Sequence, residues 1–219
     1  MVIERVKDTE LADQIAQLNV GLRERIAEAQ LQGFAQAIRE LVGSDVAKRA
    51  VTTGMRAPDF SLPDQTGRTV SLSTVLQRGP ALVVFYRGEW CPYCDLTLRA
   101  YQRSLPDITR LGASLLAISP QTPDSSLSTA EKKHLSFFVL SDVGNVVARQ
   151  YGLVFVVPEL ARHPGIPAAN GDESWELPIP GSYVIGQDGD VKLAFVDPDW
   201  TRRLEPAAIL KTLEDLRTA

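Results

Sequence analysis

The sequence is poor in the residues that most often bind metals or activate nucleophiles. Its 219 residues include only two cysteines and two histidines, His134 and His163. A structural zinc site needs about four ligands, and these few residues lie in separate parts of the chain, so no metal site is expected. We find no G-x-G-x-x-G array, P-loop, haem or flavin motif, and we therefore expect no cofactor.

Long hydrophobic runs and a strong charge of either sign are also missing. The longest apolar runs, residues 81–86 and 153–158, are far shorter than the roughly 20 residues of a membrane span. The formal charge of −4 supplies no basic face for nucleic acid or an anionic membrane. The first residues are acidic in part and lack an apolar signal core. These absences predict a cytoplasmic protein with neither a nucleic-acid nor a membrane partner.

Both cysteines belong to one C-x-x-C pair, Cys91 and Cys94, in the segment FYRGEWCPYC. The pair follows the apolar run at 81–86, which is typical of a buried strand. Pro92 suits the first position of a helix and would place Cys91 at its N-cap, where amides and the helix dipole favour a thiolate. A C-x-x-C between a strand and a helix predicts redox chemistry. Metal binding, a structural disulfide and an inert buried pair are the alternatives.

Four further residues are expected near the pair. Arg87 directly precedes the motif and would add positive charge if its side chain folds back. Trp90 and Trp175 are expected to wall the site and limit oxidant access, although Trp175 is equally suited to packing on the sheet edge. Pro180 comes directly before a predicted strand at 182–185, where it can adopt the cis form and lie against the cysteines.

The chain is predicted to consist of an N-terminal helical arm, residues 1–53, and a redox domain, residues 54–219. Apolar residues from Leu11 to Ile26 recur at three- and four-residue steps, which predicts an amphipathic helix. Gly33 is expected to interrupt the arm before a second short helix. The arm either packs on its own domain or provides a partner surface, such as a homodimer interface.

The domain alternates predicted strands and helices. Apolar runs predict strands at 81–86, 113–119 and 137–140, and a turn at 187–190 predicts a hairpin before a closing helix. A capping box predicts that a helix begins at Ser128, and residues 158–176 are predicted to form a loop. This order predicts an α/β fold, with a mixed central sheet and helices on both faces.

Four segments in this order resemble the thioredoxin-fold superfamily, and more closely its peroxiredoxin-like branch, the alkyl hydroperoxide reductase/thiol-specific antioxidant family. They are APDFSLPDQTGRTVSL, VVFYRGEWCPYC, LLAISPQTPDSSLSTAEKKHLSFFVLSDVGNVVARQYGL and PGSYVIGQDGDV. The resemblance covers about residues 55–215 and implies a thioredoxin-like fold. It also implies a thiol-dependent peroxidase that reduces hydroperoxides through a Cys91–Cys94 disulfide, with thioredoxin or a similar dithiol as reductant.

The chain departs from the family pattern Pro-x-x-x-Thr-x-x-Cys at the site itself. Arg87 stands at the Pro position, Cys91 at the Thr position and Cys94 at the peroxidatic position, while Pro180 replaces the family's catalytic arginine. The family register therefore favours Cys94 as the nucleophile, whereas the N-cap position favours Cys91. We expect Cys91 to be the exposed, ionised sulfur, and peroxide turnover to be slower than in a standard peroxiredoxin.

Two other functions fit the same motifs. A thiol–disulfide oxidoreductase acting on protein or small-molecule disulfides is favoured by the dithiol motif and by Pro180. A non-enzymatic redox sensor would use the arm to respond to disulfide formation.

Overall fold

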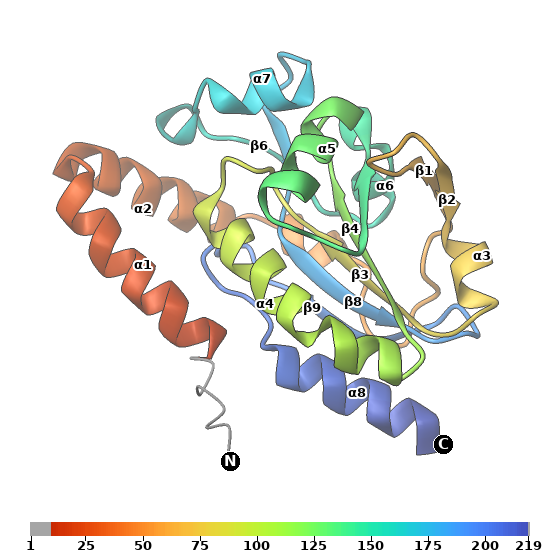
Figure 1. Ribbon diagram of the computed structural model, residues 1–219. Coiled ribbons are helices and arrows are strands. Elements are labelled where there is room, and N and C mark those ends of the chain that lie inside the picture. Colours follow the sequence, from red (N-terminus) through yellow and green to blue (C-terminus); the bar gives the residue numbers. More distant parts are fainter. Residues whose placement is uncertain (1–9, 219) are drawn as a thin grey trace.

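A five-stranded mixed sheet forms the centre of the computed structural model, which describes residues 10–218 (Figure 1). The strand order is β5-β4-β3-β8-β9. β3 (Ala81–Phe85) runs parallel to β4 (Ser114–Ser119), which runs parallel to β5 (Phe138–Ser141). β8 (Gly181–Ile185) pairs antiparallel with β3 and forms the predicted hairpin with β9 (Val191–Val196).

The fully buried strand β3 presents alternate side chains to the two faces of the sheet, as successive strand residues must. Leu82 and Val84 enter the core beneath α4 (Pro92–Arg110) and α8 (Pro206–Thr218). Figure 1 shows these two helices packed along the same face. The apolar run predicted as a buried strand therefore separates two cores.

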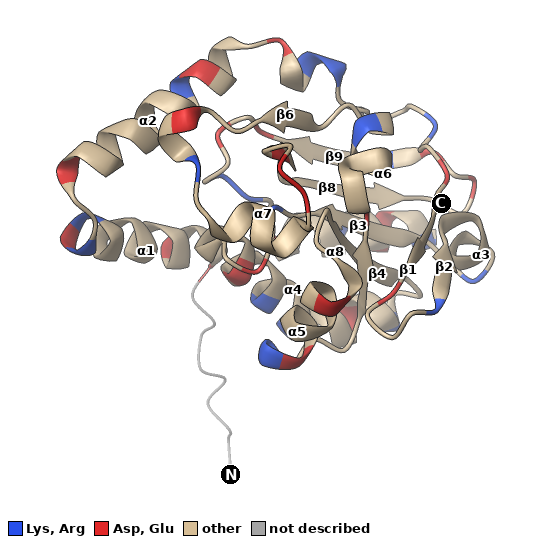
Figure 2. Cartoon of the chain, turned by 90° about the horizontal axis from the view of Figure 1, so that it is seen from above, with Lys and Arg blue, Asp and Glu red and all other residues tan. Residues whose placement is uncertain are grey.

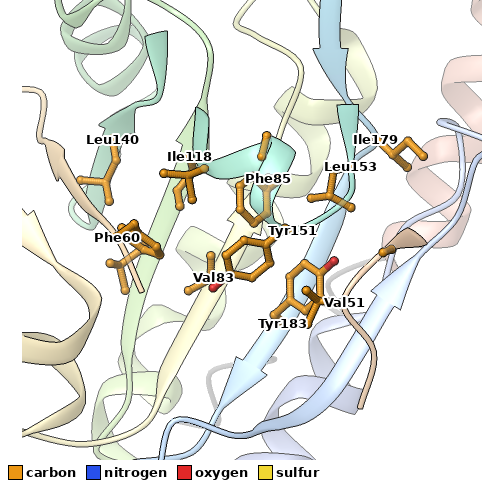
Figure 3. Close-up of a cluster of buried hydrophobic side chains, with 14 of the residues drawn as sticks. Val51, Phe60, Val83, Phe85, Ile118, Leu140, Tyr151, Leu153, Ile179 and Tyr183 are labelled. Atoms are coloured by element: carbon orange, nitrogen blue, oxygen red, sulfur yellow. The ribbon is translucent and has the colours of Figure 1, made fainter. Parts of the chain in front are cut away.

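The opposite face holds an aromatic core (Figure 3). The ring centroid of Phe85 lies 4.9 Å from that of Tyr151 and 6.1 Å from that of Tyr183. The elements that cover this core are α3 (Leu72–Leu76), α6 (Val146–Gln150), the hairpin of β1 (Ser61–Pro63) and β2 (Thr69–Ser71), and the hairpin of β6 (Val154–Val156) and β7 (Glu176–Pro178). The predicted α/β fold, with helices on both faces of a mixed sheet, is confirmed.

The arm consists of α1 (Leu11–Arg25) and α2 (Glu28–Gly43), and the first nine residues of the predicted arm lie outside the described residues. The break falls at Ile26, whose backbone is extended, so the predicted interruption at Gly33 is wrong. Gly33 lies within α2, where an added Cβ would stand 3.4 Å from the backbone oxygen of Leu160. The glycine therefore serves close packing rather than a helix break.

Both arm helices contact the rest of the chain. The Glu205 carboxylate accepts hydrogen bonds from the backbone N–H groups of Leu11 and Ala12, at 3.1 and 2.7 Å. These amides are among those that a helix start leaves without an internal partner. From α2, Ala37 and Leu41 enter the aromatic core.

Two predicted boundaries are corrected. α5 (Pro123–Lys132) begins after Thr122, whose hydroxyl caps the helix, and the predicted start at Ser128 is wrong. The earlier start wins because Thr122 and Pro123 supply the cap and the first helical residue. The predicted loop at 158–176 contains α7 (Gly165–Asn170). None of the helices within residues 10–218 combines the length and apolar character needed to cross a membrane.

Candidate redox site

The C-x-x-C pair lies where the loop after β3 enters α4. Cys91 is the N-cap, Pro92 is the first helical residue, and the Cys94 backbone N–H donates to the Cys91 sulfur at 3.4 Å. Gly88 permits the path of this loop, with φ of 149° and no room for a side chain. A Cβ there would stand 2.5 Å from the indole nitrogen of Trp90. The structure places both cysteines and Pro92 where the sequence predicts.

Both sulfurs are reduced and buried. Cys91 is 0% exposed and Cys94 is 1% exposed, so the predicted exposure of Cys91 is wrong. Trp90 and Tyr93 pack against the core that contains both cysteines. A substrate must therefore pass between side chains, and cannot meet either sulfur at an open surface.

Two guanidinium groups point at the pair. Arg87 Nη2 lies 3.1 Å from the Cys91 sulfur, as expected if this side chain folds back, and the Arg87 backbone N–H lies 3.5 Å from the Cys94 sulfur. Arg203 Nη2 lies 3.6 Å from the Cys94 sulfur. Each sulfur thus accepts one backbone N–H and one charged N–H, and such contacts favour a thiolate.

The pKa values of the two buried thiols are shifted in opposite directions. Burial acts to raise the pKa of Cys94, but the hydrogen bond from Cys91 and the charges of Arg203 and Arg87 hold it well below its usual range. Burial, together with the hydrogen bond to Cys94, holds the pKa of Cys91 well above its usual range. The balance favours Cys94 as the thiolate, contrary to the expectation that Cys91 is ionised.

The Arg87 side chain is held between two indole rings. Its guanidinium carbon lies 5.4 Å from the Trp90 ring centroid and 4.9 Å from that of Trp200, within cation–π range. Trp175, predicted as a second wall of the site, instead lies against Arg162, whose guanidinium carbon is 5.1 Å from the Trp175 ring centroid. Trp200 takes the place expected of Trp175.

Arg203 brings an arginine charge to Cys94, although Pro180 holds the family's arginine position. It stands 109 positions after Cys94, just before α8, and its Nη1 donates to the backbone oxygen of Arg202 at 2.7 Å. No motif surrounds Arg203 or Trp200, and sequence reasoning missed both. Pro180, at the family's arginine position, lines a small hollow together with Cys94 and Arg203.

The predicted cis form of Pro180 is wrong. Every peptide bond between residues 10 and 218 is trans. Pro180 nevertheless lies beside Cys94, as the sequence predicts, at the entry to β8.

A buried dithiol at a helix start, above a mixed sheet with helices on both faces, is the arrangement of a thioredoxin-fold thiol protein. The model of the AhpC/TSA family matches residues 53–194, and the chain belongs to this family. The predicted family is thus confirmed, and residues 1–52 and 195–219 lie outside the match.

Curated relatives carry the name peroxiredoxin Q. The chain is 33% identical over 145 residues to "Peroxiredoxin Q, chloroplastic" of Sedum lineare, covering 66% of this chain and 69% of the relative. Proteins of the same name from Oryza sativa subsp. japonica and Gentiana triflora are 37% and 32% identical over 145 residues. In both cases the match covers 66% of this chain but only 59% of the relative.

These names contradict the prediction of a cytoplasmic protein, because all three relatives are called chloroplastic. The prediction had rested on the missing signal core, which says little about other routes of targeting.

Solved structures share the fold. The crystal structure of Peroxidoxin BcpB from Mycobacterium tuberculosis has a TM-score of 0.62 and 25% identity, and it covers 76% of this chain and 99% of that one. A peroxiredoxin-like protein from Aquifex aeolicus has a TM-score of 0.61 at 14% identity, and the match covers 80% of this chain and 90% of that one. The second likeness concerns the fold alone.

Proposed function

We propose that the chain is a thiol-dependent peroxidase that reduces hydroperoxides through a Cys91–Cys94 dithiol/disulfide cycle. The observation that carries this proposal is the buried pair itself, in which each sulfur contacts one guanidinium group. Membership of the AhpC/TSA family and the relatives named peroxiredoxin Q support it.

The cycle begins with the Cys94 thiolate. This sulfur attacks the terminal oxygen of the hydroperoxide, the O–O bond breaks, and the products are a sulfenic acid and an alkoxide that takes up a proton. The Cys91 thiol then attacks the sulfenic sulfur, forming the disulfide and releasing water. A dithiol donor of the thioredoxin type reduces this disulfide by exchange and leaves as a disulfide itself.

The surrounding residues support the first step in separate ways. Arg203 stabilises the Cys94 thiolate, and Arg87 is placed to stabilise negative charge on the leaving oxygen. Trp90 holds the Arg87 side chain, Pro92 begins the helix that carries both sulfurs, and Pro180 closes the Cys94 side of the site. Since Cys91 replaces the family's threonine, we expect turnover to be slower than in a standard peroxiredoxin.

A thiol–disulfide oxidoreductase is the second candidate, and Pro180 favours it. A proline beside the pair offers backbone to an incoming disulfide rather than charge to a peroxide. On this proposal the thiolate of the pair exchanges with a protein or small-molecule disulfide, and peroxide is consumed only slowly.

Rapid mixing of the reduced protein with hydrogen peroxide separates these candidates. A peroxidase consumes peroxide and forms the intramolecular disulfide, and Cys91→Ser stops at a sulfenic acid on Cys94 that mass spectrometry detects. Cys94→Ser should leave almost no reaction. Consumption by the wild type no faster than by a free thiol of the same pKa would overturn the peroxidase proposal and leave disulfide exchange to be tested.

A further inference from the structure

Trp200 lies in a segment between β9 and α8 that falls outside the part of the chain matched by the family model. This segment, residues 197–204, is held in shape by its own side chains. The Asp199 carboxylate accepts hydrogen bonds from the backbone N–H and the hydroxyl of Thr201, at 3.0 and 2.7 Å. The Trp200 ring is buried and stacks on that of Phe155, with 6.1 Å between the ring centroids. The segment therefore presents this ring in a fixed position.

The fixed ring of Trp200 is one of the two that hold the Arg87 guanidinium, and Trp90 supplies the other. Arg87 is only 8% exposed, and its Nε is buried without an acceptor in the described part of the chain. That nitrogen adds nothing to the hold on the group. The position of the guanidinium therefore depends on the two ring faces and on the contact of Nη2 with the Cys91 sulfur, at 3.1 Å.

An open space lies next to this guanidinium. A cavity of about 720 Å³ between the arm and the redox domain is lined by Arg87, Trp90 and Trp200, among other residues. Figure 2 shows α1 and α2 diverging towards the domain from the bend that joins them. A charged group gains free energy when it moves from a buried site to water. Without the Trp200 ring, we expect the guanidinium to turn into the cavity and leave the sulfur.

The contact between Arg87 and Cys91 bears on the second step of the proposed cycle. The Cys91 thiol loses its proton, and the thiolate attacks the sulfenic sulfur of Cys94. The S–S bond forms as the S–O bond breaks, and the departing hydroxide takes up the proton as water. Cys91 is thereby oxidised and the sulfenic sulfur reduced. Burial raises the pKa of Cys91, and the Arg87 charge opposes this effect, because a positive charge in contact with a sulfur favours the thiolate.

From these observations we infer that Trp200 is a positioning residue that holds Arg87 against the Cys91 sulfur and so speeds closure of the Cys91–Cys94 disulfide. This inference rests on the proposed peroxidase function and adds a residue to its second step. Trp200 belongs to the aromatic core, whereas both cysteines belong to the core on the other face of the sheet. The ring therefore acts on the pair through Arg87.

The other groups around Cys91 leave the same route. The charged or titratable groups that act on Cys91 or respond to its charge are Arg87, Arg203, Cys94 and Tyr93. Arg203 donates to the backbone oxygen of Trp200, a contact that a substitution of the side chain keeps. An effect of the Trp200 ring on the Cys91 sulfur therefore reports the position of Arg87.

Three variants separate this role from general packing. Trp200→Leu removes the ring, and Trp200→Phe keeps an aromatic face for the guanidinium. Trp175→Leu is the matched control, because Trp175 covers another guanidinium, that of Arg162, at 5.1 Å from the ring centroid. Neither residue of this control pair lines the cavity beside the cysteines.

The rate of closure is measured at high hydrogen peroxide, where disulfide formation no longer depends on peroxide concentration. Acid quenching and mass spectrometry follow the sulfenic acid and the disulfide. We expect closure to be about threefold slower or more in Trp200→Leu, because loss of a contacting charge raises a thiol pKa by about one unit or more. Trp200→Phe should restore most of the rate, and Trp175→Leu should match the wild type. Equal closure in Trp200→Leu and the wild type, or equal slowing in Trp175→Leu, would overturn the inference.

A thiol titration tests the same link without turnover. In the Cys94→Ser background, ultraviolet absorbance of the thiolate gives the pKa of Cys91. Trp200→Leu should raise this pKa by about one unit or more. In the combined Cys94→Ser and Arg87→Met background the same substitution should change nothing, because no charge is left to position. A shift that persists without the Arg87 charge would show that Trp200 acts by another route.

Fluorinated tryptophan tests the contact in a protein whose core is not emptied, which decides the case if Trp200→Leu does not fold. A ring fluorine nearly keeps the size of the indole and weakens its attraction for a cation. It should raise the pKa of Cys91 in Cys94→Ser, and raise it less when Trp200→Phe is added. Equal rises would assign the effect to Trp90 and overturn the inference. If the wild type formed no disulfide with peroxide, the proposed function would fail, while both titrations would still decide whether Trp200 positions Arg87.

Discussion

Replacing Arg203 by methionine should raise the pKa of the Cys94 thiol. The substitution keeps an unbranched side chain and removes a charge whose nearest nitrogen lies 3.6 Å from the sulfur. An opposite charge at such a distance shifts a pKa by about 1–3 units. The pKa of Cys94 lies well below its usual range in the folded protein. Arg203→Met should therefore move the low-pH limb of the peroxide reaction to higher pH by about 1–3 units.

The loss of rate should be smaller than the loss of ionisation. At a pH below the pKa, each unit of increase in the pKa lowers the thiolate fraction about tenfold. The higher nucleophilicity of the remaining thiolate raises its rate of reaction roughly threefold. The net loss is about threefold for a one-unit shift and about 35-fold for a three-unit shift, at any pH below both pKa values. Well above both values, where both proteins are fully ionised, the variant should react roughly threefold faster for each unit of the pKa shift.

Two measurements on the reduced protein test this reasoning. Ultraviolet absorbance of the thiolate across pH gives the pKa directly, and stopped-flow reaction with hydrogen peroxide gives the rate at each pH. Both are repeated in the Cys91→Ser background, where one sulfur titrates alone. Arg202→Met is the control, because Arg202 is exposed and pairs with Asp197 at 2.9 Å, away from the sulfurs. An unchanged pKa in Arg203→Met, or an equal shift in Arg202→Met, would refute the role of the Arg203 charge.

Three further substitutions test the fold around the site. Leu116→Ala empties a fully buried position of β4 and should lower the free energy of unfolding by about 2–5 kcal/mol in urea titrations; a loss below 1 kcal/mol would mean that the core repacks. Gly152→Ala should lower the free energy of unfolding by at least about 1–3 kcal/mol. The reason is that the φ angle of Gly152 is 71° and an added Cβ would stand 2.1 Å from the backbone oxygen of Arg49. A melting temperature equal to that of the wild type would contradict this. Burial raises the pKa of Asp64, but hydrogen bonds from Thr66 and Arg68 outweigh it and hold this pKa below its usual value. The carboxylate therefore stabilises the fold at neutral pH and loses this effect as the pH falls through its folded-state pKa. Asp64→Asn should lower the free energy of unfolding by about 1–3 kcal/mol at pH 7. This difference from the wild type should shrink in acid. A constant difference across pH would show that the charge is unimportant.

The sequence by itself determined the elements that carry the site, because each depends on neighbouring residues. A continuous apolar run specifies the buried strand β3, and Pro92 directly after Cys91 specifies where α4 begins. Similarly, the Asp188–Gly189 turn specifies the hairpin of β8 and β9. Such patterns were enough to place both cysteines at a helix start beside a strand and to indicate the family.

Only the tertiary structure decided how the pair is surrounded. Arg203 reaches Cys94 across 109 positions because α8 packs on the same face of the sheet as α4, and no local pattern records that approach. Tertiary packing also buries Cys91, which the helix-start argument alone treats as exposed. The pKa values of the two thiols then depend on which guanidinium group each sulfur contacts. Those contacts are set by the tertiary fold and not by the spacing of residues in the sequence.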